Sequence, residues 1–211
     1  MSNKHFRRYT TLPFLLDILY WKRLPLLDPA NWDDQNDAYF IRQYRDKKDL
    51  KSVLAICLAN CEEKYHHWKI YAGNTSGVCI EFNQRILLNT IASDKRFVMR
   101  KVKYPLMDSL ERDVPSIDNL PFIKRYAFRD EEEYRVIYED CYKETIVEYI
   151  SITPRDISRI VINPWVHESV IESIKSALCT IEGFENLKVA QSSILKNEKW
   201  RKIGSQAYAL D

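Results

Sequence analysis

An acidic run that passes directly into a strand-like alternation is the segment of this sequence best suited to chemistry. Its residues are Arg129-Asp130-Glu131-Glu132-Glu133-Tyr134-Arg135-Val136-Ile137-Tyr138. Side chains two apart on a strand point the same way, so Glu131, Glu133 and Arg135 would share one face. A carboxylate on a rigid strand can accept a hydrogen bond from a sugar hydroxyl or stabilise a cationic transition state. The competing interpretation is a solvated strand edge on which Arg135 pairs with a glutamate.

Length, composition and charge indicate a single globular domain without general affinity for nucleic acid. The chain has 211 residues, 45% of them hydrophobic and only 4 of them glycine, so it can bury a sizeable core, and we expect one domain over residues 1–211. The 32 basic and 30 acidic residues give a net charge of +2, from which general nucleic-acid affinity does not follow. A local basic patch at Lys95–Lys103 alternates with apolar residues and predicts a strand with one wet face.

The cysteines and the amino terminus indicate a reduced compartment. The 5 cysteines form an odd set without the dense spacing of secreted scaffolds, so we expect free thiols. Met1–Arg8 has no apolar stretch of signal-peptide length, and no segment is long enough to span a bilayer, which predicts a cytoplasmic protein with no membrane association. Cys57, Cys61, His66 and His67 raise the question of zinc, but no second pair follows at a finger-like distance, so we expect no metal site here.

Short strands and helices alternate along the chain without repeats or obvious linkers. A loop rich in proline, aspartate and asparagine occupies residues 25–37. The strands are expected at 6–10, 53–58, 77–82, 96–104, 133–138, 146–152, 157–162 and 187–195, and the helices at 12–24, 39–51, 60–72, 84–91, 121–128 and 166–181. Strands outnumber good helices and their connections are irregular. This favours an α+β fold, a single domain with a central mixed or antiparallel split sheet flanked by helices.

Four motifs, taken in order, resemble a widespread prokaryotic family classed as a domain of unknown function. They are Arg8-Tyr9-Thr10-Thr11, Trp68-x-x-Tyr71-Ala72, Gly77-Val78-Cys79-Ile80-Glu81-Phe82 and Glu131-x-Glu133-Tyr134-Arg135. The resemblance covers most of the chain. It departs from the family in the early loop, where an Asn-Asp-Pro sequence is usual and this chain has Asp28-Pro29-Ala30-Asn31-Trp32-Asp33-Asp34.

The family in turn resembles ADP-ribosyltransferases, including toxin-like enzymes that modify DNA. Those enzymes have an early strand with Arg or His, a middle strand with Ser or Tyr, and a late strand with a catalytic Glu, often as Glu-x-Glu. The residues of this chain in that order are Arg8, then Tyr71 or Ser76, then Glu131-x-Glu133. The resemblance implies an ADP-ribosyltransferase-like fold and NAD as substrate. It also implies a toxin or anti-phage defence effector, for which a neutralising partner protein is expected.

Within that resemblance each residue type has a chemical reason. Cleavage of the bond between nicotinamide and ribose develops positive charge on the sugar, which a carboxylate such as Glu133 would stabilise. Arg8 would bind the pyrophosphate, and Tyr9 or Tyr71 would stack on nicotinamide. Glu131 would orient the acceptor or its nucleophile, and the acceptor could be protein, nucleic acid, a small molecule or water.

Each candidate also has an ordinary structural interpretation. Arg8 could be a surface residue, either tyrosine could lie at the edge of the core, and Ser76 could bond local backbone in a turn. The sequence has no Gly-x-Gly-x-x-Gly and no phosphate-loop lysine, which excludes doubly wound dinucleotide and NTPase folds. Two other functions stay open. One is a binding or regulatory module without catalysis, and the other is a metal-dependent nuclease using Asp33, Asp34, Asp37, Glu131 and Glu133.

Overall fold

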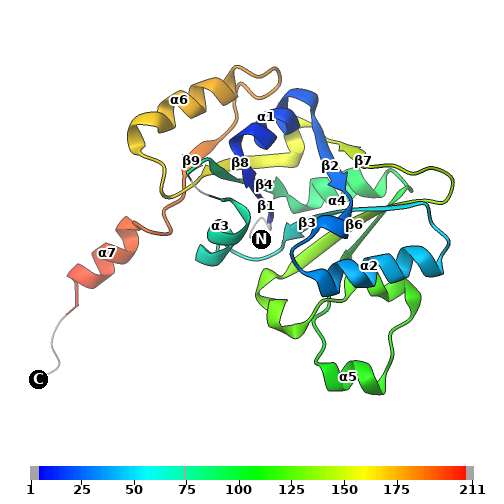
Figure 1. Ribbon diagram of the computed structural model, residues 1–211. Helices are drawn as coiled ribbons and strands as arrows, with labels where there is room; N and C mark the ends of the chain where they lie inside the picture. The colour runs from blue at the N-terminus through cyan, green and yellow to red at the C-terminus, as the bar shows by residue number, and fades with distance from the viewer. Residues whose placement is uncertain (1–4, 74, 208–211) are drawn as a thin grey trace, which may run out of the picture.

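The computed structural model describes residues 5–73 and 75–207, in which nine strands form one sheet (Figure 1). The strands are β1 (His5–Thr11), β2 (Arg23–Leu27), β3 (Ser52–Ala59), β4 (Gly77–Asn83), β5 (Phe97–Lys101), β6 (Glu133–Asp140), β7 (Val147–Ser151), β8 (Ile157–Ile162) and β9 (Val189–Gln191). The main path is β5-β6-β3-β1-β4-β8-β9, while β2 pairs with β3 and β7. Among these described strands, β8 and β9 are the one pair that runs parallel. The predicted α+β fold with a mixed sheet is confirmed.

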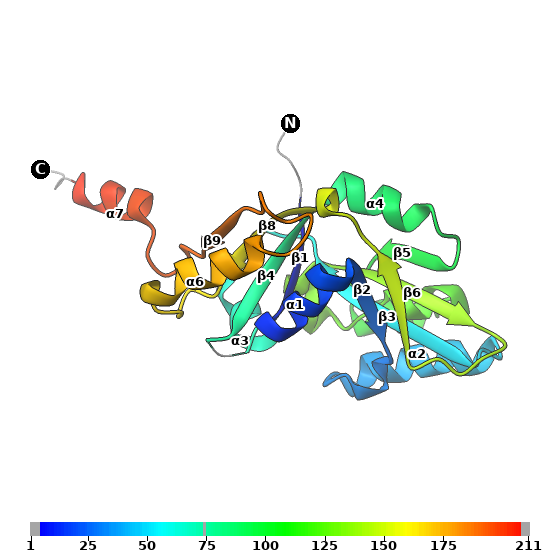
Figure 2. The same ribbon diagram turned by 90° about the horizontal axis from the view of Figure 1, so that it is seen from above.

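Helices cover the sheet on both faces. The α-helices are α1 (Leu12–Trp21), α2 (Gln35–Lys47), α3 (Tyr65–Tyr71), α4 (Gln84–Ala92), α5 (Met107–Arg112), α6 (Glu168–Cys179) and α7 (Glu198–Ser205). Short 3-10 turns are η1 (Pro29–Asn31), η2 (Ile117–Phe122), η3 (Tyr126–Glu131) and η4 (Pro154–Asp156). Figure 2 shows α2 and α4 on opposite sides of β3 and β6. No helix among the described residues has the length and apolar character needed to cross a bilayer.

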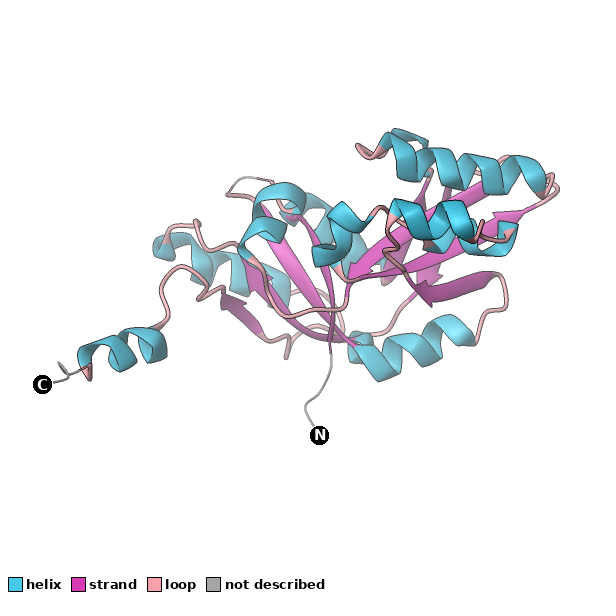
Figure 3. Ribbon diagram, turned by 90° about the horizontal axis from the view of Figure 1, so that it is seen from below, coloured by secondary structure: helices cyan, strands magenta, loops and turns pink. Residues whose placement is uncertain are grey.

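The sheet is split between β1 and β3. These two strands pair only at Arg7 and Ala59, whereas β3 pairs with β6 over its whole length and β1 does the same with β4. Figure 3 shows the strands of the two halves crossing the view at different angles. A strand pair that opens after one register position leaves side chains, rather than a backbone ladder, to fill the gap. The split is therefore where a cavity can form within the sheet.

Alternation along β3 explains how one strand serves two cores. Leu54, Ile56 and Leu58 face the main core, which α1 and α4 cover, while Val53 and Ala55 face a second core under α2 and η2. The continuous apolar run 53–58 is typical of a strand buried on both faces. A third, smaller cluster around Tyr9 and Trp68 lies beneath α3.

Several predicted boundaries are wrong for local reasons. Glu131 is not on a strand, because it ends η3 and Glu132 adopts the left-handed conformation (φ 45°) before β6 begins at Glu133. The helix expected at 121–128 is replaced by parts of η2 and η3. The strand expected at 187–195 shrinks to β9, and β2, α5 and α7 were not predicted. Pro25 lies inside β2, a position where proline argues against a central strand in sequence reasoning.

Gly77, at the start of β4, has no room for a side chain. A Cβ there would collide with the Ala72 carbonyl and lie 2.8 Å from both Ala72 Cβ and Asn163 Nδ2. We expect Gly77→Ala to lower the free energy of unfolding by about 1–3 kcal/mol through overpacking, measured by urea denaturation. Gly204→Ala in α7 is the control, because nothing lies within 4 Å of its added Cβ. Equal stability of the two variants would contradict the close approach at Gly77.

Candidate functional site

A cavity of about 470 Å³ opens at the split in the sheet. Its walls come from β1, the end of β3, the loop before α2, α3 and the segment that leads into β6. Arg8, Tyr9, Tyr71, Glu131 and Glu133 all line it. The structure thus brings together five of the six residues that the sequence nominates. They come from segments separated by more than a hundred residues along the chain.

Ser76, the sixth, does not line this cavity. It is exposed just before β4, and its backbone carbonyl accepts a hydrogen bond from the Leu12 N–H at 2.8 Å. Its position agrees with the ordinary interpretation of a turn residue and gives its side chain no place in the cavity.

The centre of the site is a fully buried guanidinium, Arg135. It donates to both oxygens of Glu133 at 2.7 and 3.1 Å, to both oxygens of Asp37 at 2.8 and 2.7 Å, and to the Pro121 carbonyl at 2.8 Å. Glu133 and Arg135 do share a strand face. The interpretation of this face as a solvated edge is wrong, because β6 lies between β5 and β3 and α2 covers the face.

Lys124 links this pair to Glu131. Its ammonium lies 2.6 Å from a Glu131 oxygen and 3.7 Å from oxygens of both Glu133 and Asp37. The Tyr71 hydroxyl donates to the other Glu131 oxygen at 2.7 Å. Three carboxylates (Asp37, Glu131, Glu133) and two cations (Lys124, Arg135) leave this cluster with a net charge of −1. We call it the acidic cluster.

The two glutamates of Glu131-x-Glu133 have pKa values shifted in opposite directions. Burial opposes ionisation of Glu133, but the charge and hydrogen bonds of Arg135, with Lys124 nearby, outweigh it and lower its pKa to about 2. For Glu131, burial dominates over Lys124 and the Tyr71 hydrogen bond, and the pKa is raised. Glu133 is therefore a fixed anion at neutral pH, and Glu131 is the carboxylate closer to exchanging a proton.

Arg8 reaches into the gap between β1 and β3. Continuing the Arg7–Ala59 register would place Tyr9 opposite Cys57, but the ladder stops and the Arg8 guanidinium donates instead to the Cys57 carbonyl at 3.1 Å. Burial lowers the pKa of Arg8, although a guanidinium stays charged at neutral pH. Among the described residues, no carboxylate lies within 4 Å of it. Arg8 is therefore a half-buried, partly desolvated cation without an ion-pair partner in this part of the chain.

Arg7, its neighbour on β1, has the opposite environment. Arg7 pairs with Glu81 at 2.9 Å and with Glu62 at 3.0 Å, and it donates to the Cys61 carbonyl. Glu81 also accepts from Arg159 at 2.6 Å. Arg7, Glu81 and Arg159 are in register across β1, β4 and β8, so they form an ion-pair network in which Arg7 and Glu81 are buried and Arg159 is exposed. Glu81 lies between Ile80 and Phe82 and is buried despite its charge.

The aromatic side chains of the cavity occupy different depths. Tyr9 is buried, with its ring 5.1 Å from Trp68 and 5.4 Å from His67, both edge-on. Its hydroxyl has no partner in hydrogen-bond geometry among the described residues. Tyr71 is 42% exposed and lies at the rim. Tyr71 is therefore the ring open to a ligand, while Tyr9 combines a core position with a polar tip, as the alternative interpretation held.

His67 is a cavity residue that sequence reasoning did not select. It is buried, and burial together with His66 lowers its pKa to about 4, so it is neutral at physiological pH. The backbone of Asp130 is close enough to influence it, but neither ring nitrogen meets hydrogen-bond geometry among the described residues. His67 and Tyr71 are four residues apart on α3, and that helical spacing was the available signal.

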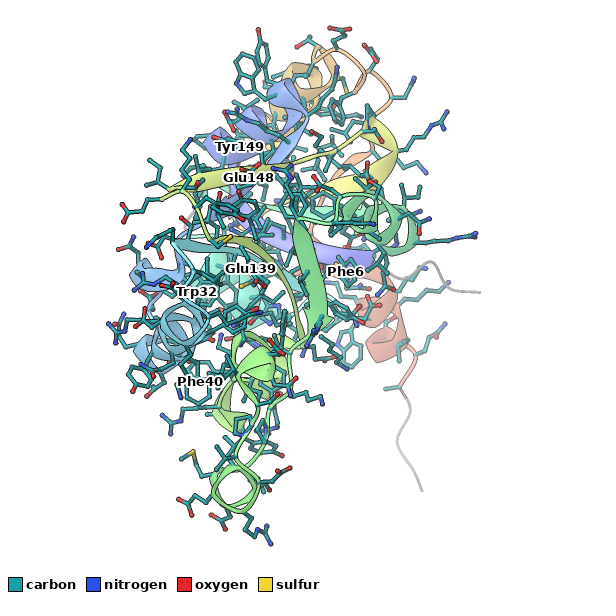
Figure 4. All side chains as sticks on the ribbon, turned by 90° about the vertical axis from the view of Figure 1, so that its right-hand side faces the viewer. Phe6, Trp32, Phe40, Glu139, Glu148 and Tyr149 are labelled. Atoms are coloured by element: carbon teal, nitrogen blue, oxygen red, sulfur yellow. The ribbon has the colours of Figure 1, made fainter. Side chains whose placement is uncertain are left out.

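The early loop forms one wall of the cavity. Trp32, labelled in Figure 4, lies with its ring centroid 4.7 Å from the Arg135 guanidinium carbon. Asp34 caps α2 by accepting from the Asn36 and Asp37 backbone N–H groups at 3.0 and 3.4 Å. This cap fixes the start of α2, from which Asp37 bonds Arg135. The loop is thus joined to the catalytic candidates through one helix turn.

The five carboxylates considered for a nuclease all line the same cavity. However, Asp37 and Glu133 are bound by Arg135, and Glu131 by Lys124. Within residues 5–73 and 75–207 no three Asp, Glu, His or Cys side chains are arranged to hold a metal ion. The arrangement gives the nuclease hypothesis no support.

The fold and cavity define an α+β protein with a split mixed sheet and a charged cleft at the split. No protein-family model matches the chain, and no curated protein matches its sequence. The prokaryotic family thus stays a resemblance.

Two solved structures show a distant likeness to this chain. The structure of Thermus sp. 2.9 DarT in complex with NAD+ aligns over 91% of this chain and 96% of that one, with 12% identity and a TM-score of 0.46. The structure of the same protein in complex with carba-NAD+ aligns over 95% of this chain and 98% of that one, with 10% identity and a TM-score of 0.45. Likeness at this level assigns neither a ligand nor a reaction to this chain.

The Arg135 ion pairs should dominate the stability of the site. Arg135→Met would leave the carboxylates of Asp37 and Glu133 buried without their main partner, which costs about 3–5 kcal/mol. Arg96→Ala removes a pair of similar length, Arg96–Asp94 at 2.7 Å, at an exposed position, where we expect about 0–1 kcal/mol. Urea unfolding of the two variants measures the difference, and equal losses would contradict the structural role of Arg135.

Proposed function

We propose that this chain cleaves the bond between nicotinamide and ribose in NAD, as an ADP-ribosyltransferase or NAD glycohydrolase. One observation carries the proposal. Arg8, a half-buried cation with no carboxylate partner among the described residues, and Glu133, a carboxylate held ionised, line the same cavity. Its volume of about 470 Å³ lies in the range of small-molecule sites.

Arg8 supplies the anion-binding half of the site. A guanidinium removed from water gains from a phosphate oxygen that replaces its lost hydration, and its fork shape suits two oxygens at once. Within the described residues its side chain donates one hydrogen bond, to the Cys57 carbonyl, which leaves other N–H groups for a ligand. We assign the pyrophosphate of NAD to this position, as the sequence resemblance implied.

Glu133 supplies the charge that the reaction needs. When the C–N bond breaks, its electron pair goes to the nicotinamide nitrogen, and the ribose carbon becomes cationic. A carboxylate that is already ionised stabilises this cation without a proton transfer. A nucleophile, from an acceptor or from water, then bonds to the ribose carbon. Glu131 accepts its proton, since Glu131 has the raised pKa of the two glutamates.

Tyr71 completes the proposed site. Its ring lies at the rim and its hydroxyl is held by Glu131, so it can pack on the nicotinamide while staying fixed. Tyr9 forms part of the inner wall. The toxin or anti-phage role and the neutralising partner rest on the sequence resemblance alone, and the acceptor is left to experiment.

A binding module without catalysis is the second candidate, and one observation favours it. Both oxygens of Glu133 already accept hydrogen bonds from Arg135, so the glutamate could serve the ion-pair network alone. In that case NAD is not cleaved and should not stabilise the protein. The two experiments below distinguish the candidates.

The first experiment measures nicotinamide release from NAD with candidate acceptors and with water. We expect Glu133→Gln to reduce the rate by about 100-fold or more, because a neutral amide cannot stabilise the cationic sugar. Glu132→Gln is the matched control. Glu132 is the adjacent residue, but it pairs with Lys64 at 3.0 Å and does not line the cavity.

The comparison requires that both variants are folded, which a urea titration checks. Release by Glu133→Gln at the wild-type rate would remove Glu133 from the mechanism. No release by the wild type with any acceptor would favour the binding module.

The second experiment measures the shift in melting temperature on addition of NAD. A ligand that binds the native state raises its stability by RT ln(1 + [L]/Kd), about 2.7 kcal/mol at a hundred times the Kd. We expect Arg8→Ala to lose most of this shift. Arg155→Ala, an exposed arginine outside the cavity, should keep it. A wild-type protein without a shift, or an Arg8→Ala variant that keeps it, would contradict the proposed anion site.

A further inference from the structure

A small lobe at one end of the molecule is exposed, apolar and acidic. It consists of residues 106–114, which include α5, and no residue of α5 is buried. Leu106, Met107 and Val114 are exposed by 56, 57 and 78%. Asp108, Glu111 and Asp113 border them, and in the described part of the chain no cation lies within 4 Å of these carboxylates. We call this the acidic lobe.

A helix at another end of the molecule has the complementary character. α7 has no buried residue, and Trp200 and Ile203, exposed by 77 and 65%, lie on one face. Lys199 borders that face and Lys202 lies beside it. Among the residues described, neither lysine has a carboxylate within 4 Å, whereas Arg201 is paired with Glu198 at 3.6 Å. We call α7 with Lys196 the basic arm.

The acidic lobe and the basic arm cannot satisfy each other within one chain. Figure 1 shows α5 projecting at the bottom of the molecule and α7 projecting to the left, well apart from each other. Each combines exposed apolar side chains with an excess of charge of one sign. The lobe has three carboxylates (Asp108, Glu111, Asp113) against Arg112, and the arm has four cations (Lys196, Lys199, Arg201, Lys202) against Glu198. Exposed apolar groups bordered by charge are typical of interaction sites.

We propose that the basic arm of one copy of this chain docks on the acidic lobe of a second copy. Trp200 and Ile203 would pack against Met107 and Leu106, and Lys199 and Lys202 would approach Asp108 and Glu111. The sign of charge on each element favours this partner, because opposite charges attract across the contact and like elements repel. An anionic membrane would attract the basic arm but would leave the acidic lobe without a partner. The arm also has only two large exposed apolar side chains, Trp200 and Ile203, which would bury little area in a membrane.

The contact joins two different surfaces, so it is heterologous. Such contacts form closed rings when the rotation between copies closes, and open chains otherwise. Both elements are short, so the interface falls at the small end of specific contacts, below about 1,200 Å², where complexes are weak. We therefore expect association that depends on protein concentration and salt. It is independent of the function proposed for the cavity.

Sedimentation equilibrium over protein concentrations up to about 1 mM tests the proposal. We expect the wild type to self-associate at low salt and to dissociate near 1 M salt, where the Debye length is about 3 Å. Both K199E/K202E and D108K/E111K should weaken self-association by about tenfold or more. A mixture of these two variants should associate again, because the reversed arm of one now meets the reversed lobe of the other.

The control for K199E/K202E is K175E/K188E. It makes the same change in net charge, at two exposed lysines that lie outside both the lobe and the arm. It should associate as the wild type does. Trp200→Ala tests the apolar part and should also weaken association.

Three outcomes would overturn the proposal. They are a monomeric wild type at every concentration, charge-reversed variants that associate as strongly as the wild type, and a mixture that fails to associate. Binding of the wild type to anionic vesicles or single-stranded DNA, lost in K199E/K202E while the protein stays monomeric, would assign the arm to those ligands instead.

Discussion

Arg135 donates every N–H group of its side chain, to two carboxylates and one backbone carbonyl, in a place that water does not reach. Burying a guanidinium is unfavourable unless all its donors are satisfied, so its partners must be positioned accurately. Those partners come from β6, the first turn of α2 and η2. One side chain thus determines how three separate segments meet, and the cavity wall formed by the early loop depends on it through Asp37 and Trp32.

The split in the sheet has a related electrostatic consequence. Arg7 and Arg8 are consecutive on β1 and point to different sides. In-register strands give Arg7 a carboxylate, Glu81, while the opening beside β3 gives Arg8 only a carbonyl. A neighbouring strand supplies fixed partners and a gap does not. Arg8 therefore lacks an ion-pair partner among the described residues because of where the sheet opens, and not only because of its residue type.

The sequence carried the parts of this structure that depend on local pattern. The apolar run 53–58 predicted the central strand. Arg8, Tyr71 and Glu133, which line one cavity, were grouped by the family resemblance and not by any local pattern. The partners of Arg135 were not accessible in this way. Asp37 is 98 positions away, and no periodicity links it to β6. The displacement of Glu131 from the strand follows from one left-handed residue, Glu132, a conformation that strand propensity does not anticipate.

The charges of the cavity are arranged for a ligand with both signs. A carboxylate has about four lone-pair positions, and Arg135 uses one on each oxygen of Glu133, so acceptor capacity remains for a ribose hydroxyl. The acidic cluster has a net charge of −1, and Arg8, which has no carboxylate within 4 Å among the described residues, is close enough to Glu133 to be influenced by its charge. NAD carries a negative pyrophosphate and a positive nicotinamide ring. In the reaction proposed above, the charge on that ring moves to the sugar as the bond breaks, so a fixed anion at Glu133 would interact more strongly with the transition state than with the bound substrate.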